Sequence, residues 1–394
     1  MLTISGRHYE NGEPVRIAIE GERIVAVEPA WPPRDAPPWP YVAPGLFDLQ
    51  INGHGGVWFG KIGITPDEVL TVLKEQFGFG VTRLCPTLIT NSFDALAAGF
   101  AAIRQACKRE RWADRLVPGC HLEGPYISSE EGPRGAHPRE HVRPPDWTEF
   151  QKLQEISGNR IRLVTLAPEL PGACDFIRKA VTSGVVIAIG HTAATGEEIA
   201  AAVEAGARLS THLGNGAHGM IRRHPNYIWE QLGDPRLTAS VISDGHHLPA
   251  SVLRSILRAK STRNVIVTCD AAGLAGCPPG IYTEGAMRME ILEDGRIVVA
   301  GQRQFLAGSG ARTGDCVVQV VRQGGVALPE AIDMAGRNPS RLLGFEEIRL
   351  RRGAQADLFL FDFPAGANSL DVKATVAAGT LQFGTIPSAA GATH

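Results

Sequence analysis

The stretch covering residues 185–215 constrains the fold of this chain more than any other. It contains an apolar run that ends at His191, an alanine-rich amphipathic segment, and a second short run that ends at His212. A run of Val and Ile without polar alternation is typical of a strand covered on both faces, and a helix between two such runs makes a parallel βαβ unit. Because adjacent parallel strands end at the same edge, we expect the two histidines to lie close together.

The same alternation of strand and helix continues through residues 44–345. We predict strands at 45–51, 81–88, 115–124, 161–168, 185–192, 208–215, 237–245 and 264–273. Eight such units over about 300 residues are what a (β/α)8 TIM barrel requires. After the sixth strand we expect a functional loop with a short helix, and after the eighth a β excursion over residues 277–309.

The two ends of the chain predict a second, smaller β domain. Residues 15–29 have the pattern of a hairpin that turns at Gly21, and residues 353–363 and 371–383 have the pattern of strands. A proline-rich connector, residues 31–40, cannot continue a sheet. We therefore expect a small β-sandwich domain built from residues 1–43 and 346–394, with the catalytic barrel inserted between its halves.

Charge and cysteine usage exclude several classes of protein. A net charge of −2 gives no reason to expect binding to nucleic acid or to an anionic membrane. The seven cysteines form no C-x-x-C pair, and their usage is typical of reduced thiols. Neither a signal peptide nor an apolar run of membrane-spanning length is recognisable, so we expect a cytoplasmic protein.

Polar residues at the predicted strand ends form a candidate active site. They are Gln50, Asn52, Glu123, His191, His212, Asp244, His247 and Asp270. One carboxylate with two imidazoles is the ligand set of a catalytic zinc site, which keeps a position open for water. The carboxylate at the eighth strand could then act as a base. We expect His121 to face away from Glu123 and to pack in the core.

Ten short motifs follow one another along the chain. In order they are PGLFDLQINGHGG, HLEGPYIS, GAHP, TLAPE, IGHTAAT, STHLGN, SDGHH, CDAAG, LAGS and NPSRLLG. With these motifs the chain resembles the amidohydrolase superfamily, and within it the N-acetylglucosamine-6-phosphate deacetylase family, from Pro44 to Leu343. The resemblance implies metal-dependent hydrolysis of the N-acetyl group of N-acetylglucosamine 6-phosphate or a closely related amino sugar phosphate.

The resemblance also implies a role for each site residue. Asp270 would activate the metal-bound water and later pass the proton to the leaving amine. His137, in the GAHP motif, would polarise the acyl carbonyl, and His247 would contact the sugar. The implied metal ligands are Glu123, His191 and His212.

The end of the first strand bears on the number of metal ions. Some members of the superfamily have His-x-His there and hold two metals, whereas this chain has Gln50 and Asn52, neutral amides that bind zinc poorly. We infer one divalent ion per subunit, with zinc favoured and Gln50 supporting the site from outside the ligand set. Whether His54 reaches the metal stays open.

The residues expected to bind the substrate lie in the segment after the sixth strand. The resemblance implies that Asn215, the backbone at Gly216 and Arg223 bind the sugar phosphate, with the arginine reaching across a homodimer. The sequence of residues 214–231 departs from the family, however, and adds His218, His224, Tyr227 and Trp229. Two alternatives therefore remain: the same chemistry on a different N-acyl or cyclic amide, or an inactive barrel that acts as a binding protein.

Overall fold

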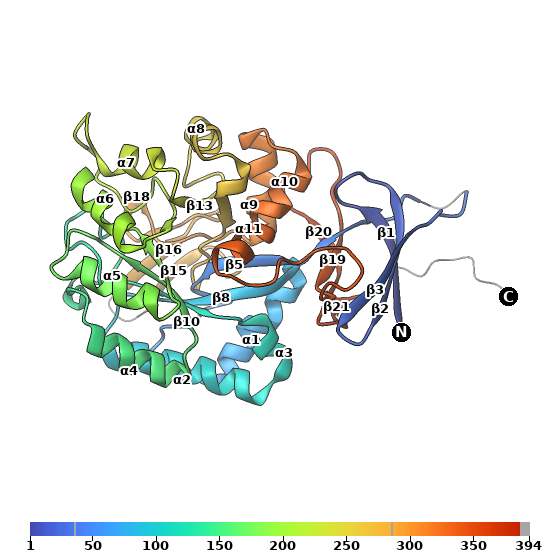
Figure 1. Cartoon of the computed structure of the whole chain (residues 1–394), viewed down its shortest axis with the longest axis horizontal. Coiled ribbons are helices and arrows are strands. Elements are labelled where there is room, and N and C mark those ends of the chain that lie inside the picture. Colours follow the sequence, from blue (N-terminus) through green and yellow to red (C-terminus); the bar gives the residue numbers. More distant parts are fainter. Residues whose placement is uncertain (35–36, 285–286, 387–394) are drawn as a thin grey trace.

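Figure 1 shows the computed structural model, which describes residues 1–34, 37–284 and 287–386. The predicted connector, the predicted excursion and the predicted end of the small domain fall partly on positions 35–36, 285–286 and 387–394, which lie outside the described residues. A large α/β body occupies the left of the view, and a smaller β domain lies on the right.

The large body is a nearly closed barrel of eight parallel strands, which confirms the predicted fold. In sheet order the strands run β14-β13-β12-β11-β10-β9-β8-β5. Their bounds are β5 Leu46–Ile51, β8 Val81–Ile89, β9 Cys120–Glu123, β10 Ile161–Leu166, β11 Val186–Ile189, β12 Leu209–Ser210, β13 Thr238–Ile242 and β14 Val265–Thr268.

A buried carboxylate joins the first barrel strand to the last. Asp48 on β5 is fully buried and accepts hydrogen bonds from the backbone N–H of Cys269 (3.0 Å) and from the hydroxyl of Thr268, both at the end of β14. It also accepts from Gln50 N–H (2.9 Å) and from the Thr313 hydroxyl (2.7 Å). The side chain of Asp48 therefore helps to hold β5 against β14, where the barrel closes beside the predicted site.

Replacing Asp48 with alanine is expected to lower the free energy of unfolding by about 3 kcal/mol or more, because each buried donor left without a partner costs about 1–3 kcal/mol. The midpoint of urea denaturation should fall accordingly. Asp371→Ala, which removes an exposed carboxylate of the small domain, is the control. Equal midpoints for the two variants would contradict a closing role for Asp48.

Helices cover the outside of the barrel and alternate with its strands (Figure 1). Their bounds are α1 Pro66–Gln76, α2 Phe93–Arg109, α3 Arg111–Leu116, α4 Trp147–Ser157, α5 Ala173–Thr182, α6 Gly196–Ala205, α7 Tyr227–Gly233, α8 Ala250–Lys260, α9 Thr313–Gln319, α10 Leu328–Met334 and α11 Arg337–Leu342. Short turns of helix are η1 Phe77–Phe79, η2 Arg139–His141, η3 Thr262–Asn264 and η4 Val320–Gly324. Among the described residues, no helix combines the length and the apolar character needed to cross a bilayer.

Three local predictions can be compared with these bounds. The third strand begins at Cys120 and not at residue 115, because helix α3 extends to Leu116 and Pro118 follows it. The predicted short helix after the sixth strand is α7, and the predicted excursion is a four-stranded antiparallel sheet. The strands of that sheet are β15 Gly280–Glu284, β16 Met287–Ile291, β17 Ile297–Val299 and β18 Gln302–Leu306, and a small pair, β6 Gly53–His54 and β7 Val57–Trp58, follows β5.

The interior of the barrel is layered. An apolar cluster that includes Phe47, Leu163, Ile266 and, from the segment after α11, Leu343 fills the end at which the strands begin. Above it His121 Nε2 lies 2.8 Å from the hydroxyl of Thr165. The expectation that His121 faces away from Glu123 is wrong, because residues two apart on a strand share a face. This polar layer separates the apolar floor from the strand ends that carry the candidate site.

The small domain is built from both ends of the chain, as predicted. Its seven strands form one continuous sheet in the order β21-β20-β19-β4-β1-β2-β3, and the blue and red strands lie together in Figure 1. Side chains from both halves pack in one apolar cluster, which includes Ile17 from the N-terminal half and Leu360 from the C-terminal half. The bounds are β1 Leu2–His8, β2 Pro14–Glu20, β3 Arg23–Pro29, β4 Tyr41–Pro44, β19 Leu358–Asp362, β20 Asp371–Ala377 and β21 Thr380–Gly384.

Candidate metal centre and active site

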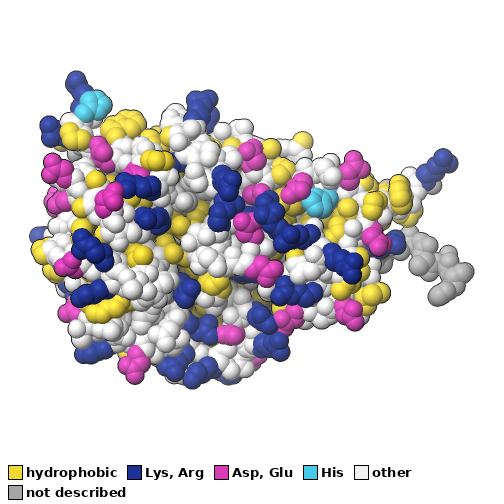
Figure 2. Space-filling model, viewed as in Figure 1, with side chains coloured by type: hydrophobic (Ala, Val, Ile, Leu, Met, Phe, Trp, Pro, Cys, Tyr) yellow, Lys and Arg dark blue, Asp and Glu magenta, His cyan; other side chains and the backbone are white. Residues whose placement is uncertain are grey.

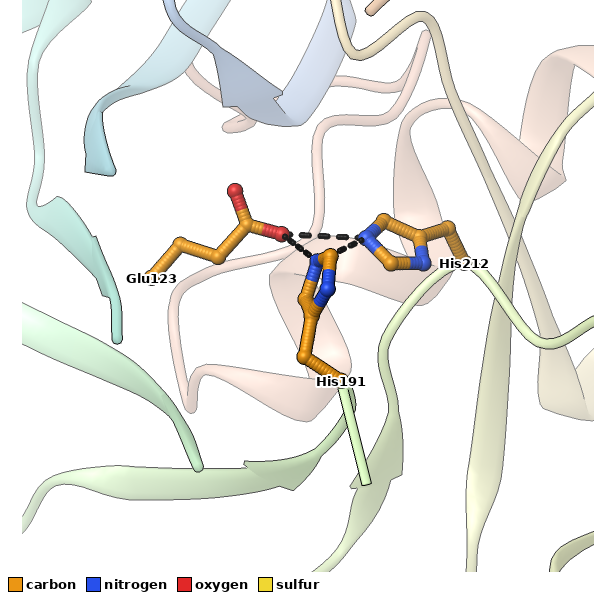
Figure 3. Close-up of side chains that lie close together, drawn as sticks. All are labelled: Glu123, His191 and His212. Carbon is orange, nitrogen blue, oxygen red and sulfur yellow. Dashed lines mark hydrogen bonds and ion pairs between the residues drawn. The ribbon is translucent and has the colours of Figure 1, made fainter. Parts of the chain in front are cut away.

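The structure brings Glu123, His191 and His212 together at one end of the barrel (Figure 3). Glu123 is the last residue of β9, and each histidine lies two positions after the end of its strand, His191 after β11 and His212 after β12. Glu123 Oε1 lies 3.2 Å from His191 Nε2 and 3.0 Å from His212 Nε2, and the two Nε2 atoms are 3.1 Å apart. The three side chains are buried.

These spacings fit a single small cation. Ligand atoms about 2.0–2.1 Å from a tetrahedral zinc ion lie about 3.3 Å from one another, close to the three separations seen here. A carboxylate with two imidazoles leaves a fourth position for water or substrate. The donor set and its geometry therefore suit one divalent ion.

Hydrogen bonds from outside the trio hold two of these side chains in position. His191 Nδ1 lies 2.8 Å from the carbonyl oxygen of Pro133, which keeps the proton on Nδ1 and leaves the Nε2 lone pair for a metal. Gln50 Nε2 donates to Glu123 Oε1 at 2.9 Å, which links the first barrel strand to the trio. Burial alone would raise the pKa of Glu123, but its contacts with the two histidines hold that pKa well below the usual value.

The backbone at three site residues is strained. His191, His212 and Asp270 have φ angles of +53°, +30° and +50°, in the left-handed region that side chains with a Cβ rarely adopt. Each one follows a barrel strand, where the chain turns sharply from the strand into a loop. Strain of this kind is retained where the surrounding structure fixes it, and it is frequent at functional sites.

Asp270 lies beside the trio and is buried. Asn52 Nδ2 donates to its Oδ1 at 2.7 Å, so the neutral amide of the first strand positions this carboxylate. Burial, and after it the negative charge of Glu123, raises the pKa of Asp270 to about 7 in the absence of a cation. A carboxylate that exchanges a proton near neutral pH is suited to act as a general base and then as a general acid.

His137 also belongs to this cluster. Its ring centroid is 4.3 Å from that of His191, and its Nδ1 lies 2.8 Å from the hydroxyl of Thr90. Burial, followed by the proximity of His191, lowers the pKa of His137 to about 3, so the imidazole is neutral at physiological pH.

His247 is held by a separate buried carboxylate. Its Nδ1 lies 2.7 Å from Asp244 Oδ2, which also accepts from the hydroxyl of Ser309 at 2.9 Å. Ser309 in turn bonds through its backbone N–H to the carbonyl of Asp270, which ties this pair to the end of the eighth strand. Burial would raise the pKa of Asp244, but the bonds from His247 outweigh it and keep that pKa below its usual range. The neighbouring His246 is exposed.

The segment after the sixth strand divides into a part near the trio and a part away from it. Asn215 Nδ2 donates to the carbonyl of His212 at 3.2 Å, and a Cβ on Gly216 would lie 2.8 Å from His191 Nδ1. Arg223 is exposed, and so is Trp229, a residue that is 53% accessible. Within one subunit the structure does not bring Arg223 to the trio.

Replacing Gly216 with alanine is expected to weaken metal binding. Its φ of +56° disfavours any side chain, and the new methyl group would push His191 away from Pro133. Loss of an outer-shell partner typically costs about 10–100-fold in metal affinity, and we expect a loss in that range by competition with a chelator. Gly219→Ala, in the same segment but with open space around its Cβ position, should bind metal normally. Equal affinities would refute this account.

His54 is directed elsewhere. Its Nε2 lies 3.6 Å from Glu75 Oε2, its ring packs on Phe79, and it is not part of the group of possible ligands. Among the described residues, the structure therefore does not place His54 in the group that could hold the metal.

Several supporting residues were missed from the sequence. Glu169 accepts hydrogen bonds from the Thr192 hydroxyl (2.6 Å) and from Ala193 N–H (2.7 Å), and so fixes the turn directly after His191. Asp48 could have been found, because it is an acidic residue within an otherwise apolar strand. Pro133 contributes only a backbone oxygen, and no side-chain pattern could have indicated it.

Known proteins resemble this chain over most of its length. The sequence profile described as "Amidohydrolase family" matches residues 41–381. An N-acetylglucosamine-6-phosphate deacetylase of Bos taurus is 34% identical over 354 residues, which is 86% of this chain and 83% of the relative. An N-acetylgalactosamine-6-phosphate deacetylase of Escherichia coli O157:H7 is 32% identical over 344 residues, covering 86% and 88%.

A solved structure shows the same likeness in three dimensions. The crystal structure of N-acetyl-D-glucosamine-6-phosphate deacetylase from Mycobacterium smegmatis superposes with a TM-score of 0.86 at 30% identity, covering 97% of this chain and all of that one. More distant structures, such as the 5-methylcytosine deaminase of Klebsiella pneumoniae (TM-score 0.59, 11% identity), share the fold alone.

Proposed function

The chain belongs to the amidohydrolase family, and from that premise we propose that it hydrolyses the N-acetyl group of N-acetylglucosamine 6-phosphate or a closely related amino sugar phosphate. The products are acetate and the amino sugar phosphate. The observation that carries the proposal is the buried trio Glu123, His191 and His212, with mutual spacings of 3.0–3.2 Å, beside the carboxylate of Asp270. Deacetylase relatives that match 86% of the chain support the substrate class.

The trio would hold one divalent ion per subunit, with zinc favoured by the mixture of nitrogen and oxygen donors. Such an ion supplies Lewis-acid polarisation and lowers the pKa of a water. Gln50 and the carbonyl of Pro133 keep two of the three ligands oriented before any ion arrives.

Asp270 is the proposed proton carrier. As a carboxylate it takes a proton from the attacking water, and as an acid it delivers that proton to the leaving amine nitrogen, so that the C–N bond breaks with a neutral amine departing. Its burial and the bond from Asn52 to Oδ1 hold the carboxylate in place, and the transfer would use Oδ2.

His137 is the proposed electrophilic group at the acyl oxygen. A neutral imidazole polarises a carbonyl only if it carries a proton on the nitrogen that faces the substrate. The Thr90 hydroxyl lies 2.8 Å from His137 Nδ1 and can donate a hydrogen bond to Nδ1. The ring proton then stays on Nε2, the nitrogen that we propose faces the acyl oxygen. The low pKa of His137 supports this neutral form.

His247 and the segment at 214–231 are the proposed sugar and phosphate contacts. Asp244 fixes the Nδ1 side of His247 and leaves Nε2 for a sugar hydroxyl. Asn215 and Gly216 lie next to the trio. Arg223 is exposed, and we propose that it binds the sugar phosphate in the active site of the other subunit of a homodimer. The proposed location of the enzyme is the cytoplasm. Arg fits this role because its planar fork can bond two phosphate oxygens.

Acetate release from three compounds tests the proposal. We expect turnover of N-acetylglucosamine 6-phosphate or N-acetylgalactosamine 6-phosphate, and a much lower kcat/KM for unphosphorylated N-acetylglucosamine. The galacto epimer is included because relatives of both kinds match this chain at similar identity. Activity that ignores the phosphate, or no acetate from any of the three by the metal-loaded protein, would refute the proposed substrate.

A further inference from the structure

A hollow with a volume of about 460 Å³ lies at the end of the barrel opposite the candidate active site. It is bounded by Val186 and Thr238, the first residues of β11 and β13, and by Arg208 and Asn264, which directly precede β12 and β14. Since Glu123 and the two histidines stand where the strands end, the hollow and the trio are separated by the length of the barrel strands.

The lining of this hollow is strongly basic. Four of its lining residues are arginines, and none of the described residues that line it is acidic. The arginines are Arg208, Arg236, Arg263 and Arg341. Figure 2 shows Lys and Arg side chains, with some Asp and Glu among them, near the middle of the face it presents, in the region of α11 in Figure 1.

Two of the four arginines already have acidic partners. Arg236 bonds to Glu204 and, at 2.7 Å, to Asp234, and Arg341 lies 3.4 Å from Glu347. In these two cases the ordinary explanation, a surface ion pair, is sufficient.

The other two arginines lack such partners among the described residues. Arg208 Nη1 donates to the backbone carbonyls of Val203 (3.0 Å) and Ala207 (2.7 Å), which fixes the guanidinium without neutralising it. The guanidinium of Arg263 has neither a hydrogen bond nor an ion pair within the described ranges; only its backbone carbonyl is used, by Arg341. Two positive charges thus remain uncompensated in one concave site, where they attract anions.

A neighbouring hollow provides a contrast. It shares Arg263, Asn338 and Arg341, but three carboxylates line it beside its arginines: Glu330, Asp333 and Glu347. None of these carboxylates is paired with Arg263, and the excess of positive charge is larger in the first hollow, whose described lining contains no carboxylate.

We infer that the basic hollow at the strand starts binds a small phosphate monoester with an apolar or flat body. A phosphate monoester carries about −1.5 to −2 charges at pH 7, which matches two uncompensated guanidiniums. The hollow also has an apolar wall that includes Val185 and Leu342, and its volume is in the range of small-ligand sites. The whole-chain net charge of −2 disfavours a polyanion as the occupant.

Calorimetric titration of the metal-loaded full chain tests this inference, with AMP as the ester and inorganic phosphate as the headgroup alone. We expect saturable AMP binding with a Kd below about 1 mM, tighter than for phosphate, and weaker at high salt. The double variant Arg208→Gln/Arg263→Gln should bind AMP at least tenfold more weakly and deacetylate at the wild-type rate. Arg16→Gln, an exposed arginine of the small domain, is the matched control.

Each outcome decides the matter. Absence of saturable AMP binding, or unchanged binding in the double variant, would overturn the site, and the second result would place AMP elsewhere on the protein. Phosphate that binds as tightly as AMP would overturn the role of the apolar wall. Because the deacetylase assay is independent, failure here leaves the proposed function standing, and failure of that assay leaves this titration valid.

Discussion

Asp270→Asn is expected to retain the metal and to lose about 10²–10⁴-fold in kcat, the usual contribution of a general acid–base group. The amide has nearly the shape of the carboxylate and can still accept the bond that Asn52 donates to Oδ1 at 2.7 Å, so the site should stay assembled. It cannot accept a proton from water or return one to the amine. Acetate release in steady state gives kcat, and elemental analysis gives the metal content of the same preparation.

The matched control for this substitution is Asp175→Asn, whose exposed carboxylate on α5 pairs with Arg178 on the same helix. It should leave the rate unchanged. A wild-type rate in Asp270→Asn would remove Asp270 from the chemistry, and loss of metal together with rate would make it a ligand.

Glu123→Gln is expected to have a still larger effect, because it removes one of only three ligands. The amide fills the same volume, and its oxygen can still accept from Gln50, so the barrel should fold. Neutral amides bind zinc poorly, and the buried histidines would be left without the charge that faces them. We expect metal affinity to fall by more than the about 10–100-fold typical of an outer-shell loss, and deacetylation to fall to background.

Glu140→Gln, an exposed carboxylate of the segment after β9, serves as the control and should keep both properties. Circular dichroism of the two variants separates loss of metal from loss of fold. If Glu123→Gln retained a full equivalent of metal and wild-type turnover, the trio could not be the metal site.

The parts predicted from the sequence share a physical cause. Parallel strands buried on both faces show as continuous apolar runs, and the carboxyl ends of such strands meet at one edge. This rule alone predicts that His191 and His212 lie close together, although 21 positions separate them in the sequence. The same rule places Glu123, which ends another barrel strand, at that edge. Pairing of the two chain ends in one sheet followed from the alternating patterns on both sides of the barrel.

The parts that could not be predicted depend on contacts that leave no pattern in the sequence. The carbonyl of Pro133 orients His191, and any residue could have supplied it. Arg208 and Arg263 each resemble an ordinary basic residue at the start of a strand, and only the closed barrel puts them around one hollow. The misplaced start of the third strand arose because Arg115 and Leu116 end a helix of only six residues, which is too short to show a helical period in the sequence.

The roles proposed for the three ligands, for Asp270 and for His137 all depend on one ion at the trio. Anomalous diffraction at the zinc absorption edge, from crystals of the zinc-supplemented protein, tests this directly. The account predicts one strong peak per subunit, about 2.0–2.2 Å from Glu123 Oε1, His191 Nε2 and His212 Nε2. A peak that lies elsewhere, or no peak in a crystal whose protein is folded and zinc-saturated, would contradict it.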